Sequence, residues 1–86
     1  MLAIPPGETI KEMLEDRHMI QRELAFKTGL SESYISRLIK GKTTLFPEIA
    51  KVLSNVLGPS PTFWLNLEAG YRRDLELEKE EKKNDE

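Results

Sequence analysis

The segment QRELAFKTGLSESYISRLIK, residues 21–40, constrains the fold more than any other part of the chain. Ala25 is small where a crossing helix needs room. Gly29 accepts the left-handed backbone of a helix end, a conformation that costs other residues about 1–2 kcal/mol. The remaining positions of the pattern are apolar: Leu24, Leu30, Ile35 and Leu38. The pattern predicts two short helices that are joined by a tight turn at Gly29 and cross each other at a steep angle.

Two helices in this arrangement form a helix-turn-helix, whose second helix lies in the major groove of DNA with its N-terminal residues against the base edges. We expect Glu32, Ser33 and Arg37 to face outward and to read bases. Arg37 suits a bidentate contact with guanine, and Glu32 either accepts from the cytosine amino group or pairs with a neighbouring basic residue. The alternative is an ordinary helical hairpin in an unrelated bundle, which rarely needs Ala and Gly at these two places together.

The two ends of this motif are expected to meet the DNA backbone. Gln21 opens the first helix, where its side chain and backbone N–H can hold a phosphate. Lys40, Lys42, Thr43 and Thr44 come at and after the end of the second helix and are the next candidates. The net charge of the chain is −2, but residues 20–51 hold six basic and three acidic side chains. The positive excess is modest, and it coincides with the motif.

The flanking sequence predicts three further helices. Pro5-Pro6-Gly7 favours a helix start and is followed by apolar residues at helical spacing, which gives a helix from Gly7 to Arg17. Pro47 suits the first turn of another helix. The inward stripe of that helix is expected to be Phe46, Ile49, Ala50, Leu53 and Leu57. The break at residues 58–61 precedes a last helix that begins near Ser60 to Thr62.

These elements predict an all-α fold with a helix-turn-helix domain over residues 1–73 and a charged tail over residues 74–86. The last helix can continue through Tyr71 and Leu75, although Gly70 weakens it by about 1 kcal/mol relative to alanine. The tail holds seven acids and three lysines, and fraying or disorder is expected from Lys79 onward. It is either a solubilising helix extension or a surface for a basic partner.

The composition narrows the function further. A core built from 86 residues is marginal alone, and without cysteine neither a disulfide nor a thiolate zinc site can support it, so dimerisation is expected. Phe63, Trp64, Leu67 and Tyr71 form an apolar stripe in the last helix, where Trp64 is expected in the core and Phe63 or Leu65 at a dimer interface. His18 is the only histidine and has no evident catalytic or metal-binding partner. We therefore expect no enzyme activity and no cofactor.

No apolar run reaches the length of a membrane span, and the N-terminus lacks the pattern of a signal peptide. This favours a soluble, cytoplasmic protein.

Three stretches resemble the Xre/Cro (lambda-repressor-like) helix-turn-helix family, and most closely its HigA/VapI branch of plasmid-maintenance antidote proteins. They are PGETIKEMLEDR, QRELAFKTGLSESYISRLIKGK and PSPTFWLNLEAGY. The resemblance implies a five-helix domain that dimerises, represses its own operon through a palindromic operator and neutralises a HigB-type toxin. Carried over residue by residue, the family's base-reading positions fall on Glu32, Ser33 and Arg37. Its phosphate contacts fall on Gln21, Ser31 and the Lys40–Thr43 turn.

The chain departs from the family at Ile20, where a Ser or Thr usually caps the helix that follows. The tail after Arg73 also exceeds the shortest antitoxins. These departures leave two alternatives open. One is the DNA-binding domain of a larger or phage-type regulator, and the other is a protein-interaction module without strong DNA binding.

Overall fold

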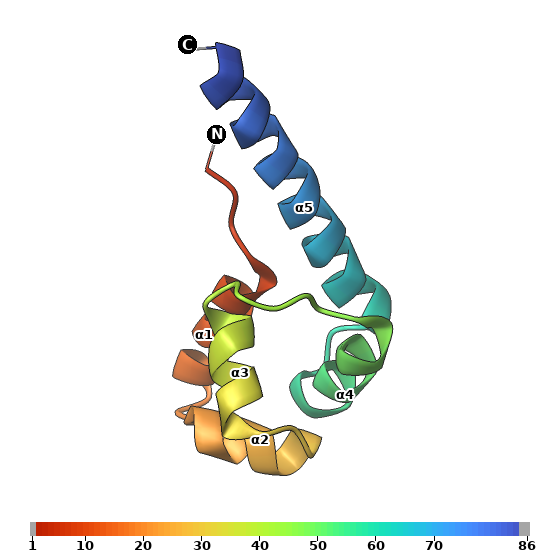
Figure 1. The fold of residues 1–86 in the computed structure, drawn as a ribbon. Coiled ribbons are helices and arrows are strands. Elements are labelled where there is room, and N and C mark those ends of the chain that lie inside the picture. The colour runs from red at the N-terminus through yellow and green to blue at the C-terminus, as the bar shows by residue number, and fades with distance from the viewer. Residues whose placement is uncertain (1, 85–86) are drawn as a thin grey trace.

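The computed structural model describes residues 2–84, and side chains through residue 81. Five helices and no strand occupy this part of the chain, which confirms the predicted all-α class. Their bounds are α1 Pro6–Asp16, α2 Gln21–Thr28, α3 Glu32–Ile39, α4 Pro47–Leu57 and α5 Pro61–Asn84. The first four helices and the start of α5 form a compact head, and the rest of α5 projects beyond it (Figure 1). The molecule therefore measures 46 × 22 × 21 Å.

One apolar core joins all five helices. Trp64 of α5 is fully buried at its centre, as its place in the apolar stripe predicted. The other fully or almost fully buried side chains include Ile10, Leu14, Leu24, Ile35, Leu38, Leu53 and Leu57. Burial of each such side chain contributes about 1.5–3 kcal/mol, which stabilises the steep crossing of the short helices α2 and α3.

The core differs from the predicted one at the start of α4. Phe46 was expected on the inward stripe, but its side chain is 54% exposed, whereas that of Leu45 is 2% exposed. The reason is that Phe46 is the N-cap residue and has extended backbone, with φ −83° and ψ 162°. Side chains alternate sides along extended backbone, so the helical stripe does not apply before Pro47.

Helix α5 continues into the charged tail. It reaches Asn84, past Lys79, from which fraying or disorder was expected, and residues 85–86 lie outside the described part. The N-terminal segment runs beside this projection (Figure 1), and the backbone N–H of Ala3 donates to the carboxylate of Glu78. The expected boundary at residue 73 thus falls inside a continuous helix.

Candidate nucleic-acid interface

The turn between α2 and α3 has the predicted geometry. Gly29 lies in the left-handed region, with φ 77°, and its N–H donates to the carbonyl oxygen of Ala25 at 2.9 Å. Thr28 adds a support that the sequence pattern did not reveal, because its hydroxyl donates to the carbonyl oxygen of Leu24 at 2.8 Å and accepts from the N–H of Leu30 at 3.3 Å. The turn is thereby fixed on both sides of Gly29.

Helix α3 begins with a side-chain cap. The hydroxyl oxygen of Ser31 accepts from the N–H of Tyr34 at 3.0 Å, which satisfies one of the free donors of the first turn. Glu32, Ser33 and Arg37 are all exposed on α3, and Ser31 is exposed beside them. Ile35, Leu38 and Ile39 are buried on the opposite side, against the core. One face of α3 is therefore free to lie against another molecule.

The end of α3 is fixed by two backbone hydrogen bonds around Gly41, whose φ is 73°. The N–H of Gly41 donates to the carbonyl oxygen of Leu38 at 3.1 Å, and the N–H of Lys42 donates to that of Arg37 at 2.9 Å. This pair defines a Schellman motif. Lys40 and Lys42 are exposed at this turn and Thr43 is half-buried. The backbone of Lys42 is thus held at a set distance from Arg37.

Helix α2 begins without a side-chain cap. Ile20 is its N-cap residue and has no acceptor in its side chain. Its own N–H donates only weakly to the carboxylate of Glu23, at 3.5 Å. Gln21, the first residue of α2, is half-buried and lines a shallow cavity of about 340 Å³ together with Lys11 and Glu15 of α1. The uncapped N–H groups at this end carry the positive end of the helix dipole.

Two interactions restrain the side chains on the exposed face of α3. Arg37 lies over the ring of Tyr34, with 5.8 Å between its guanidinium carbon and the ring centroid. Glu32 lies 4.0 Å from the guanidinium of Arg22 on α2. Both partners of this second pair are largely exposed, so it contributes at most about 1 kcal/mol. Pairing of Glu32 with a basic neighbour was one of its two expected uses.

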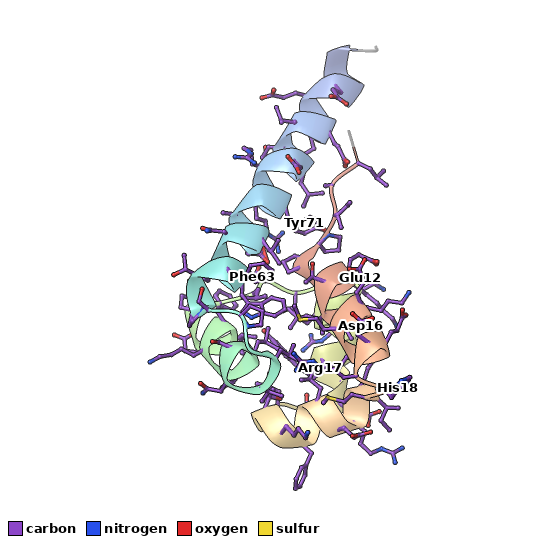
Figure 2. All side chains as sticks on the ribbon, turned by 180° about the vertical axis from the view of Figure 1, so that it is seen from behind. Glu12, Asp16, Arg17, His18, Phe63 and Tyr71 are labelled. Carbon is purple, nitrogen blue, oxygen red and sulfur yellow. The ribbon has the colours of Figure 1, made fainter. Side chains whose placement is uncertain are left out.

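The acidic residues of α1, the single histidine and the candidate dimer residues lie away from this face. Glu12, Asp16 and His18 line the outer surface of α1 and the turn after it (Figure 2), and His18 adopts a positive φ of 52° there. The described residues contain no group of three side chains that could hold a metal ion. On α5, Phe63 is 39% exposed and packs edge-on against Trp64, at 5.3 Å between centroids, whereas Leu65 is half-buried against the core. No helix within residues 2–84 has the length and apolar character that crossing a bilayer requires.

Comparison with known proteins agrees with this geometry. Residues 10–65 match the helix-turn-helix (HTH_3) family model. The uncharacterized HTH-type transcriptional regulator YddM of Escherichia coli K12 is 44% identical over 66 residues, which cover 77% of this chain and 70% of YddM.

Similar solved structures come from antidote proteins. One from Nostoc punctiforme, described as an antidote protein of a plasmid maintenance system, superposes with a TM-score of 0.90 at 28% identity and covers 99% of this chain and 93% of its own. A HigA-family addiction module antidote protein from Coxiella burnetii gives a TM-score of 0.86 at 28% identity, over 96% of this chain and 91% of its own. Pseudomonas aeruginosa antitoxin HigA, solved with the higBA promoter, shares the fold with a TM-score of 0.86 at 22% identity, over 95% of this chain and 90% of its own.

Proposed function

This chain belongs to the helix-turn-helix family of DNA-binding transcriptional regulators, and on that premise we propose that it is an antitoxin-type repressor that binds the operator of its own operon. The observation that carries the proposal is the outer surface of α3. Ser31, Glu32, Ser33, Arg37 and Lys40 are exposed there, and the backbone of Lys42 is fixed at the end of α3 by the Schellman motif. The antidote-protein neighbours, among them a HigA solved with promoter DNA, support the choice of regulator.

In this proposal base reading falls on Glu32, Ser33 and Arg37. Phosphate contacts fall on the residues at the two ends of the motif, namely Gln21, Ser31, Lys40, Lys42 and Thr43. The exposed side chains of α3 enter the major groove, and the uncapped N-terminus of α2 faces a phosphate. The protein acts where the DNA is, in the cytoplasm.

The repressor is proposed to be a homodimer that binds a palindromic operator. The partly exposed Phe63 on α5 and its neighbour Leu65 are the candidates for the dimer interface. A two-fold dimer presents its two α3 helices to half-sites about 34–36 Å apart, or a multiple of that. A HigB-type toxin is the proposed protein partner, and the antidote-protein neighbours support it.

Binding to selected DNA tests the proposal. A duplex is selected from a random-sequence library with the purified protein, and its affinity is measured by fluorescence anisotropy over a series of KCl concentrations. The proposal expects a palindromic selected sequence and two protein chains per duplex. It also expects the logarithm of the binding constant to fall linearly with the logarithm of the salt concentration, with a slope of about −0.9 for each phosphate contact. No enriched sequence, with no binding even at low salt, would contradict it.

One observation favours the second candidate, a protein-interaction module with weak DNA binding. Phe26 on α2 is 88% exposed, which is unusual for a large aromatic side chain. Exposed aromatic side chains are enriched at protein interfaces. Two results together would favour this candidate: the protein selects no DNA sequence, and a Phe26→Ser variant loses toxin binding.

A further inference from the structure

The segment that follows the Schellman turn is attached to α5 through a buried carboxylate. Glu68 is only 8% exposed. One of its oxygens accepts from the backbone N–H of Leu45 at 3.0 Å, and the other accepts from Nε of Arg72 at 2.6 Å. Arg72 extends the attachment, because its Nη2 donates to the hydroxyl of Thr44 at 3.2 Å. Two side chains of α5 therefore hold two consecutive residues of the α3–α4 segment.

The same segment is attached to α3 from its other side. The hydroxyl of Tyr34 donates to the carbonyl oxygen of Thr44 at 3.2 Å, and the ring of Tyr34 lies under the guanidinium of Arg37. The N–H of Lys42 is bound to the carbonyl oxygen of Arg37. Residues 42–45 are thus fixed at both ends, with the backbone N–H of Lys42 at the first attachment and Thr43 between the two. The hydrogen bonds form a path from the outer surface of α3 to α5.

A charged carboxylate is not needed merely to hold the backbone of a turn. A buried carboxylate is costly to desolvate, and a neutral acceptor would satisfy the N–H of Leu45 at a lower cost. Arg72 is 45% exposed, yet its guanidinium is directed by two acceptors and by the ring of Tyr71, at 5.3 Å from its centroid. A segment that is ordered before binding loses less conformational entropy when its side chains meet a ligand.

We infer that Glu68 and Arg72 are positioning residues for DNA binding, which hold the α3–α4 segment so that Lys42 and Thr43 meet the DNA backbone without first being ordered. The inference rests on the proposed function, because it takes Lys42 as a phosphate contact. It assigns to α5 a role in DNA affinity although neither residue touches DNA. Arg72 acts through Lys42 and Thr43, and its effect depends on them.

A double-mutant cycle between Arg72→Ala and Lys42→Ala tests the inference. Affinities are measured by anisotropy on the duplex that the wild-type protein selects from a random library, over a series of KCl concentrations. Arg73→Ala is the matched control, because it removes the same charge from the next residue of α5, whose side chain is 76% exposed and whose ion pair to Asp74 spans 4.0 Å. Arg72→Lys, which keeps the charge without the two-pronged contact, separates positioning from long-range attraction.

The expected pattern is non-additive. Lys42→Ala weakens binding about tenfold and lowers the salt dependence by about one phosphate contact. Arg72→Ala weakens binding about fivefold in the wild-type background but less than about twofold in the Lys42→Ala background, because Arg72 acts through the backbone segment that carries Lys42 and two changes that share a backbone shift do not add. Arg73→Ala has an effect of less than about twofold, and Arg72→Lys recovers only part of the loss.

Other results would contradict either the inference alone or the phosphate assignment of Lys42 as well. If Arg72→Ala costs the same with and without Lys42, Arg72 acts independently and the inference is wrong. If Lys42→Ala weakens binding but Arg72→Ala behaves like Arg73→Ala, the inference fails and the proposed function stands. If Lys42→Ala changes nothing, the phosphate assignment fails and the inference fails with it. Should Arg72→Ala not fold, Thr44→Val removes only the hydroxyl that Arg72 contacts, and the same non-additivity with Lys42→Ala is required of it.

Discussion

The backbone of Gly7 on α1 lies directly against the backbone of Ile39 on α3, so that a β-carbon on Gly7 would overlap with the carbonyl oxygen of Ile39. Neither backbone can move without shifting a whole helix. Gly7→Ala is therefore expected to destabilise the protein by about 2–3 kcal/mol, as overpacking does in a rigid interior. Thermal unfolding followed by the fluorescence of the single tryptophan, Trp64, measures the change. A loss of more than about 10 °C in Tm is expected for a domain of this size.

Gly70 in α5 is the matched control for Gly7. A β-carbon there would meet only the guanidinium of Arg73, at 3.9 Å. Because glycine in a helix interior is less favourable than alanine by about 1 kcal/mol, Gly70→Ala should raise the Tm. Equal effects of the two substitutions would contradict the close approach of α1 and α3.

The missing cap of α2 gives a prediction in the stabilising direction. Ile20 is 55% exposed and has the extended backbone of an N-cap residue, so little burial is lost when it is replaced. Ile20→Thr supplies a hydroxyl acceptor and, with Glu23 three residues later, completes a capping box. Its free energy of unfolding in urea should exceed that of Ile20→Val, which has the same shape without the hydroxyl, by about 1 kcal/mol. No difference between the two variants would mean that water already satisfies the free N–H groups of α2.

The helices around the turn could be predicted because their signals are local. Gly29, Ser31 and Gly41 each determine the backbone within one turn of themselves, and α2 begins at Gln21 and ends before the turn at Gly29, as predicted. The position of Phe46 was predicted wrongly because the helical stripe was extended one residue beyond the start of α4, into extended backbone. The exact end of α5 could not be predicted, because the charges of the tail do not determine how far the helix continues; it reaches Asn84.

The supports of the candidate interface could not be predicted, because they join residues far apart in the sequence. Glu68 reaches Leu45 across 23 positions, and Arg72 reaches Thr44 across 28. A buried glutamate in an amphipathic helix gives no sign in the sequence of which backbone N–H it will accept from. The exposed face of α3, in contrast, follows from the helical spacing of its three buried residues, and its assigned roles in reading DNA remain predictions.

The contacts of Arg17 also join residues far apart in the sequence and could not be predicted. They give a third prediction. It ends α1, and its guanidinium donates to the carbonyl oxygens of Val56, at 3.3 Å, and Leu57, at 2.5 Å, at the end of α4. A cation at this end of a helix also interacts favourably with the helix dipole. Arg17→Met, which keeps the length of the side chain, should lower the free energy of unfolding by about 1 kcal/mol. Arg73→Met is the control. A similar loss of unfolding free energy in both variants would show that Arg17 does not stabilise the protein through its contacts with the end of α4.

Arg37 on α3 is proposed to read a base, whereas Lys42, which follows α3, is proposed to contact a phosphate. This difference gives the last prediction. Arg37 is exposed and restrained over the ring of Tyr34, which suits a side chain that must present two donors to one base, and such a pair provides about 1–3 kcal/mol of discrimination. Arg37→Ala should therefore reduce the ratio of affinities for the selected and a scrambled duplex by about tenfold or more. Lys42→Ala should weaken both duplexes by nearly the same factor, because phosphate contacts carry no sequence information. Anisotropy titrations of both variants on both duplexes, at one fixed KCl concentration, separate the two effects. If Arg37→Ala leaves the ratio unchanged, base reading belongs to other residues of α3, even if the protein still binds DNA.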